Sequence, residues 1–188
     1  MLKSDVTAFA DYSLHPGWPY TYRVRALSLQ GPSPFSNNAA AAVPSTLAVV
    51  VTAGSLTDSA KFAKDKISLT ATYARQPANP DAVIDPVRDG VQLQIGSPGS
   101  PVAISVAAGD KTWKLKKGKA TWKSVNGVLP KVVMVVDTEK QVLTVKVSGA
   151  TFDGAPSTTS RSLFAVGLDG GLELKTWTVK KPGVLFFK

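Results

Sequence analysis

Hydrophobic residues alternate with polar ones along most of the chain. Val91, Leu93 and Ile95 are separated by two glutamines, and residues 66–73 show the same period of two. This alternation places successive side chains on opposite faces of an extended backbone, so it predicts strands with one buried face. The best helical candidate, residues 55–64, is short and poorly phased. The pattern therefore predicts an all-β protein.

Beyond residue 46, about ten short strands are predicted, separated by turn signals such as Asn126-Gly127 and Lys117-Gly118. Their approximate ranges are 47–52, 66–73, 90–96, 102–106, 113–116, 120–124, 131–136, 141–147, 161–168, 172–179 and 183–187. Longer loops are expected at 75–89 and 148–160. Short strands at regular spacing are typical of an antiparallel β-sandwich.

The first 43 residues carry a turn followed by an alternating strand. The run Leu14–Ala26 reads Leu-His-Pro-Gly-Trp-Pro-Tyr-Thr-Tyr-Arg-Val-Arg-Ala. In the strand predicted over 20–29, Tyr20, Tyr22 and Val24 fall on one face. A hairpin connection at 30–34 and a returning strand at 38–43 follow.

This run, followed by Gly-Pro-Ser-Pro-Phe-Ser-Asn at 31–37, resembles the closing strands of a fibronectin type III domain. The family signature is Leu-x-Pro-Gly-x-x-Tyr-x-Tyr-Arg-Val-Arg-Ala, then Gly-x-Ser-Pro-x-Ser-Asn. The resemblance implies that the chain begins inside such a module, with its first two thirds absent. It also implies that Tyr20 is the corner tyrosine, whose hydroxyl bonds to the backbone of the preceding loop.

The predicted organisation is a truncated fibronectin type III-like segment at 1–43, a linker at 44–46 and a β-sandwich at 47–188. Residues 50–150, with an Asp-Pro turn, the strand 90–96 and a Lys/Gly hairpin after an Ala-Gly turn, resemble a poorly characterised sandwich module of bacterial secreted and surface proteins. That module carries no known active site. The two resemblances imply an extracellular or cell-surface location.

Composition excludes several kinds of chemistry. The 188 residues contain no cysteine, which excludes disulfides, thiolate nucleophiles and Cys-ligated zinc. No apolar run is long enough for a transmembrane helix, and no signal peptide is visible. The net charge is +9, carried almost entirely beyond residue 43, and a positive charge by itself attracts polyanions without specifying one.

Six lysines gather in one short segment: Lys111, Lys114, Lys116, Lys117, Lys119 and Lys123. A lysine stripe interleaved with aromatic residues can bind nucleic acid with strong salt dependence. Lysines on an edge hairpin also prevent edge-to-edge aggregation. Because Trp113, Leu115 and Trp122 alternate as core residues do, the pattern favours a solvated edge over a specific polyanion site.

Tryptophan is the other candidate binding residue type, since coplanar indoles stack on sugar rings. The sequence contains Trp18, Trp113, Trp122 and Trp177. Tryptophan is more often buried, so core positions are the default expectation. Trp18, which lies in a turn, is the expected exception. The candidate binding residues are Trp18, Lys114, Lys116, Lys117, Lys119 and Trp122.

Catalytic and metal-binding candidates are weak. His15 is the only histidine, and its loop position favours an ordinary loop residue over a catalytic base. Asp81, Asp85 and Asp89 could supply oxygens to calcium, but no Asp-x-Asp-x-Asp-Gly pattern is present and aspartate is common in turns. No cofactor is expected.

These observations predict a non-catalytic accessory or interaction module of a secreted or cell-surface bacterial protein. Two or three strands are only marginally stable in water, so residues 1–43 are expected to pack on the sandwich, on another protomer or on a partner protein. A homodimer formed through this incomplete sheet is the concrete form of the hypothesis. The alternatives are a carbohydrate-binding module and a small hydrolase whose site is not visible in the sequence.

Overall fold

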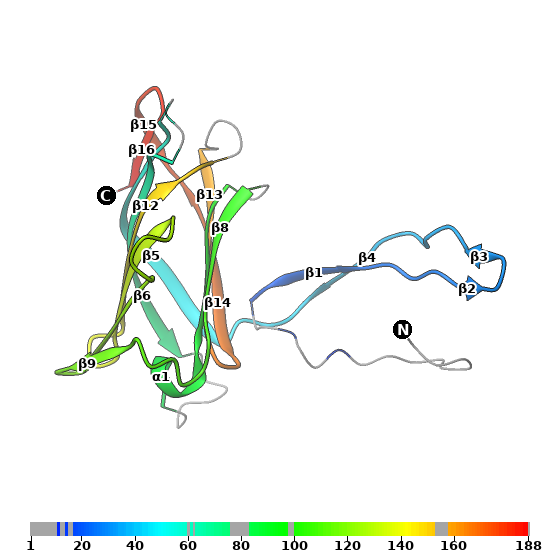
Figure 1. Ribbon diagram of the computed structural model, residues 1–188, viewed down its shortest axis with the longest axis horizontal. Helices are drawn as coiled ribbons and strands as arrows, with labels where there is room; N and C mark the ends of the chain where they lie inside the picture. The colour runs from blue at the N-terminus through cyan, green and yellow to red at the C-terminus, as the bar shows by residue number, and fades with distance from the viewer. Residues whose placement is uncertain are drawn as a thin grey trace.

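The structure, a computed structural model, describes residues 11, 14, 17–59, 61, 63–75, 83–97, 100–152 and 158–187. Figure 1 shows two β-sheets packed face to face, from which a long β-hairpin projects. The described residues form sixteen strands and one short helix, α1 (Pro86–Asp89). The predicted all-β class and antiparallel sandwich are confirmed.

The larger sheet has eight strands, all paired antiparallel. In spatial order they are β15 (Thr178–Lys181), β16 (Val184–Phe187), β5 (Leu47–Thr57), β6 (Asp65–Arg75), β12 (Val142–Ala150), β11 (Lys131–Asp137), β10 (Lys119–Lys123) and β9 (Lys114–Lys116). The smaller antiparallel sheet has the order β14 (Asp169–Thr176), β13 (Thr159–Val166), β7 (Val91–Ser97) and β8 (Ser100–Val106).

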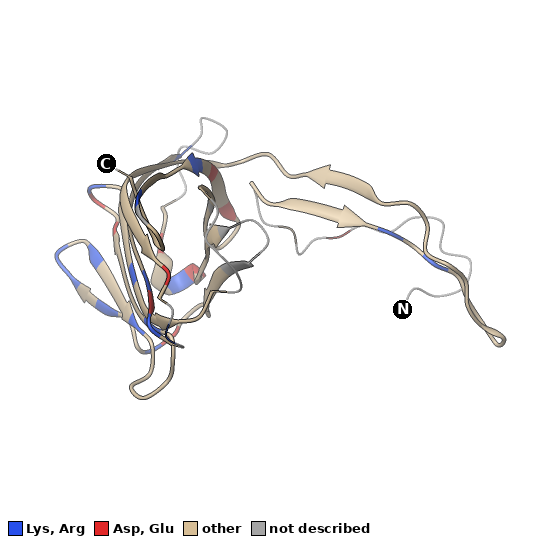
Figure 2. Ribbon diagram, turned by 90° about the horizontal axis from the view of Figure 1, so that it is seen from above, with Lys and Arg blue, Asp and Glu red and all other residues tan. Residues whose placement is uncertain are grey.

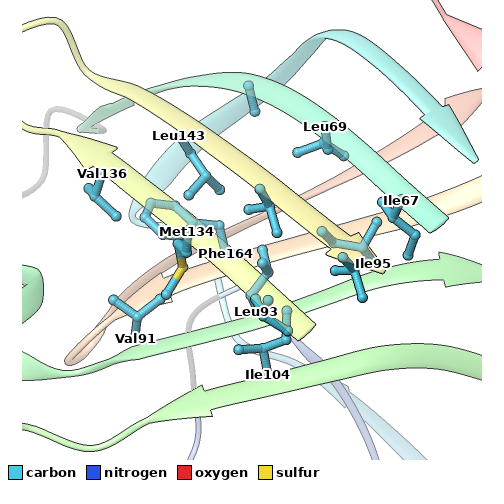
Figure 3. Packing of buried hydrophobic residues seen from close by; sticks show 14 of the residues in the cluster. Ile67, Leu69, Val91, Leu93, Ile95, Ile104, Met134, Val136, Leu143 and Phe164 are labelled. Atoms are coloured by element: carbon cyan, nitrogen blue, oxygen red, sulfur yellow. The ribbon is translucent and has the colours of Figure 1, made fainter. Parts of the chain in front are cut away.

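The core lies between these two sheets and is built from the inward halves of the alternating strands. Figure 3 shows Met134 and Leu143 from the larger sheet facing Leu93 and Phe164 from the smaller one. All four side chains are almost fully buried. Removing their apolar surface from water is the main stabilising contribution to the sandwich.

The two sheets approach most closely where β5 passes β14. Gly171 on β14 lies so near Leu47 that a Cβ at position 171 would sit 2.1 Å from the Leu47 carbonyl oxygen. A mostly buried ion pair between Arg75 on β6 and Asp169 on β14 ties the same edge. Only glycine permits this approach, so Gly171 fixes the spacing of the sheets there.

Three local expectations were wrong. β5 continues to Thr57, across the start of the weak helical candidate. The predicted loop at 75–89 contains α1, capped by the Asp85 carboxylate, which accepts hydrogen bonds of 3.0 Å from the backbone N–H groups of Val87 and Arg88. The loop predicted at 148–160 is shorter, because β12 runs to Ala150 and β13 starts at Thr159.

The projecting hairpin, called the arm below, comprises residues 17–43. At its base β1 (Pro19–Tyr22) pairs with β4 (Ala39–Ala42), and at its tip β2 (Leu27–Ser28) pairs with β3 (Gly31–Pro32). The strand predicted over 20–29 is therefore interrupted between β1 and β2. There the hydroxyl oxygens of Ser36 and Ser33 accept from the N–H groups of Val24 and Ala26 at 3.0 and 2.9 Å.

Among the described residues, no helix is long and apolar enough to cross a membrane, in agreement with the sequence.

Candidate functional site

The arm is the most unusual surface of the molecule, because its apolar side chains face solvent. In Figure 1 the tip with β2 and β3 stands clear of the sandwich. The side chains of Val24, Leu27 and Phe35 are 70%, 51% and 45% exposed, and Leu29 at the tip is fully exposed. A surface that collects large apolar residues in this way is typical of an interaction site.

Aromatic and cationic groups give the arm its local order. The rings of Tyr20 and Tyr22 stack with centroids 6.4 Å apart, and Arg23 lies 3.9 Å from the centroid of Phe35. The hydroxyl of Tyr22 donates to Asp11 at 3.2 Å. Partial burial, reinforced by that bond, raises the pKa of Tyr22. These contacts shape the arm without covering it.

The base of the arm is attached to the smaller sheet. Thr46, just beyond the arm, donates its N–H to the Gly170 carbonyl at 2.9 Å, while the Gly17 N–H closes the hairpin itself by donating to the Val43 carbonyl at 2.9 Å. Gly17 also lies against Gly171, since a Cβ at position 17 would be 2.9 Å from the Gly171 Cα. The Thr46 hydroxyl also accepts from the Gly170 N–H at 2.9 Å, so the attachment is made by backbone groups and this one hydroxyl beside Gly171.

The predicted lysine hairpin is β9–β10, and it forms one edge of the larger sheet. Lys117 and Gly118 form its turn with φ values of 47° and 67°, as a tight hairpin turn requires. Lys114, Lys116, Lys117 and Lys119 are exposed, and Lys119 Nζ lies 3.6 Å from the Asp137 carboxylate. A hollow of about 360 Å³ separates this hairpin from residues 83–86.

The aromatic candidates are less accessible than the lysines. Trp113 and Trp177 are buried core residues, as expected by default, and the Trp177 indole N–H donates to the Ser160 hydroxyl. Trp18 and Trp122 are half-buried. Trp122 on β10 comes opposite Trp113 in the β9–β10 register, while Trp18 precedes β1 and Trp177 lies between β14 and β15.

Asp85 and Asp89 have structural roles, whereas Asp81 and His15 lie outside the described residues. Asp85 caps α1, and Asp89 forms a bidentate pair with the adjacent Arg88 at 2.6 and 2.7 Å. Hydrogen bonding from Arg88 holds the pKa of Asp89 below its usual range. Within the described ranges, no group of three or more His, Cys, Asp or Glu residues could hold a metal ion.

Sequence reasoning missed a second set of lysines on the outer face of the larger sheet. Lys66, Lys131 and Lys146 lie on β6, β11 and β12, far apart in the sequence. Each of these lysines occupies an outward position on its strand, and the alternation of the sequence predicts that outward position. What brings them together is the strand order, and the alternation of residues carries no information about that order.

Comparison with known proteins gives no match: no family model, curated protein or solved structure is significantly similar to this chain. The fibronectin type III resemblance of the arm therefore stays a prediction. Any functional argument must come from the surfaces described above.

Proposed function

We propose that the protein is a non-catalytic interaction module that self-associates through its arm. The observation that carries this proposal is the apolar arm surface, exposed in a protein whose sandwich core is fully packed. The sandwich serves as the scaffold, and the arm is the docking element.

An isolated two-stranded hairpin is marginally stable in water, so the arm needs a partner surface. Near its base the arm lies against the sandwich at Gly17, and Thr46, just beyond the arm, bonds to Gly170. Beyond that base, Val24, Leu27 and Phe35 remain in solvent. Covering them on association removes apolar area from water, at roughly 25 cal/mol per Å².

A second copy of the chain is the proposed partner, because β4 offers a self-complementary edge. Within the part of the chain that the structure describes, β4 pairs only with β1. Its residues are four exposed alanines, without charge, proline or bulge to prevent pairing. Two such strands related by a twofold axis can pair antiparallel, with each alanine row meeting an identical one.

Sedimentation velocity from low to high micromolar concentration tests the proposal. We expect a monomer–dimer equilibrium that is weakened at least about tenfold in the double variant Leu27→Lys/Phe35→Ser. The matched control is Val125→Lys, which adds the same charge at an exposed valine outside the arm. A monomer at every concentration, or equal weakening by the control, contradicts the proposal.

The carbohydrate-binding and hydrolase alternatives stay predictions, as does the extracellular location, which depends on the resemblance. For the carbohydrate alternative, retention on insoluble polysaccharide that is lost in Trp18→Ala or Trp122→Ala is the corresponding measurement. For the hydrolase alternative, it is turnover of model esters that is lost on replacement of His15.

A further inference from the structure

The outer face of the larger sheet carries a groove with lysines on both sides. The inward residues of β6, β12 and β11 are apolar, and the outward positions of β6 and β12 are mostly lysine and hydroxyl residues, joined by Lys131 of β11. In one cross-strand row Lys66 faces Ser148, which in turn faces Lys131. In the adjacent row Lys146 lies between Ser68 and Val133.

The register fixes how these lysines are spaced. Lys66 and Lys131 are two strands apart, so their backbones are separated by roughly 10 Å, given neighbouring strands about 4.8 Å apart. Lys146 lies on the intervening strand, two residues along from Ser148. The three lysines therefore start from the corners of a triangle, with Ser148 midway along the side that joins Lys66 and Lys131.

The surface between these residues is hollowed. A trough of about 600 Å³ is lined by Lys66, Lys131 and Lys146 together with Ser55, Thr57, Ser68 and Ser148. A second hollow of about 300 Å³ shares Lys66 and Lys131 and adds Lys64. A third, of about 260 Å³, shares Ser55 and Ser68 and reaches Phe186 on β16, one strand in from the sheet edge. Shared lining residues join the three into one groove across five strands.

The lysine ammonium groups of this groove have no carboxylate partner among the residues that the structure describes. No carboxylate of the described ranges lies within ion-pair distance of Lys64, Lys66, Lys131 or Lys146. Elsewhere in the sandwich, Lys119 and Lys175 each have a carboxylate partner. Figure 2 shows that lysine and arginine also predominate over the sandwich as a whole. An anionic ligand would relieve the mutual repulsion of the groove lysines.

We propose that the groove binds a linear acidic polysaccharide bearing carboxylate or sulfate groups. The lysines contact the anionic groups, and the hydroxyls of Ser55, Ser68 and Ser148 exchange hydrogen bonds with sugar hydroxyls. Phe186 gives the apolar face of one sugar ring a surface to pack on at the end of the groove. A single-stranded nucleic acid would instead need several aromatic rings among the lysines for base stacking, and the aromatic rings of the described groove lining, Phe186 and Phe187, belong to the third hollow and not to the two that the lysines line.

Isothermal titration calorimetry with a heparin-derived hexasaccharide tests the proposal, with Lys66→Gln/Lys131→Gln/Lys146→Gln as the variant. We expect affinity to fall at least about tenfold and the slope of log K against log salt to decrease by about two to three. The side chains are exposed, so the melting temperature should be unchanged.

The matched control is Lys111→Gln/Lys117→Gln/Lys140→Gln, which removes the same charge from exposed turn positions. It should retain the parent affinity. The proposal would be overturned if the control lost as much affinity as the groove variant, or if the parent protein bound no heparin hexasaccharide. It would also be overturned if the parent bound duplex DNA at the same ionic strength, or a neutral hexasaccharide, as tightly as the heparin hexasaccharide. Phe186→Ala should weaken binding while leaving the salt slope unchanged.

Discussion

The arm and the sandwich are both built from antiparallel strands, yet they bury their apolar residues to opposite extents. On β5 the inward residue Val51 is completely buried, whereas Val24 and Leu27 in the arm are mostly exposed. The sandwich strands face a second sheet, and the arm strands face none. Alternation therefore specifies which side of a strand is apolar, while burial depends on whether another layer is present.

Two tyrosines show the same contrast in chemical terms. Tyr73 in the sandwich is buried, packs against Phe164 and donates to the Asp137 carbonyl at 3.1 Å. Burial, helped by the Asp137 charge, raises the pKa of Tyr73 to about 12. Tyr22 in the arm is half-buried and donates to an aspartate side chain instead. A hydroxyl bonded to a backbone carbonyl inside the core is held by the whole fold, whereas the Tyr22 bond depends on the arm alone.

The largest expected difference between the regions is the cost of truncating an apolar side chain. Leu143→Ala should lower the free energy of unfolding by about 2–5 kcal/mol, because it leaves a cavity in the packed core. Leu27→Ala should lower it by less than about 0.5 kcal/mol at low protein concentration. Urea denaturation measures both. An equal cost at low concentration would mean that the monomer itself covers the arm.

The next effect concerns the contact that joins the regions. Gly171→Ala places a Cβ against the Leu47 carbonyl and the Val49 side chain, so the sheets must separate, at about 1–3 kcal/mol. Hydrogen exchange at the Thr46 amide, which donates to Gly170, should accelerate. In the control Gly127→Ala, the added Cβ meets no neighbouring atom and any strain comes from the φ of 86° in the turn between β10 and β11, so exchange at Thr46 should not change. Unchanged exchange in Gly171→Ala would show that the arm is attached elsewhere.

The smallest effect depends on pH. The folded pKa of Tyr73 is about 12 against an ordinary value of 10.0, so its contribution to stability is complete below pH 10 and is lost as pH rises towards 12. Tyr73→Phe should cost about 1 kcal/mol at neutral pH, through the lost hydrogen bond. The stability difference between parent and variant should shrink at alkaline pH. A difference that stays constant between neutral and alkaline pH would contradict the assignment.

Strands could be predicted from the sequence where the alternation is clear, as in residues 66–73 and 90–96. The errors arose where tertiary contacts override the local pattern. β5 extends through residues 55–57 because it pairs with β16 and β6 on its two sides. The single turn of α1 has too few residues for periodicity, and its signal, Asp85 followed by Pro86, also occurs in ordinary turns.

The two lysine-rich surfaces were predictable to different degrees. The β9–β10 lysines are close in sequence, so a hairpin prediction was enough to group them. The groove lysines were not predictable as a group, because Lys66 reaches Lys146 only through the pairing of β6 with β12, strands separated by five others along the chain. Sequence alternation gives the outward phase of each strand, but the order of strands depends on long-range packing.

The side of the sandwich from which the arm departs has a consequence for both proposals. It leaves next to β14, on the smaller sheet (Figure 1). The lysine groove lies on the outer face of the larger sheet. Two molecules joined by their arms would therefore keep both grooves unobstructed. A polymer long enough to reach both would be held bivalently, with an avidity set by the distance between the grooves rather than by bulk concentration.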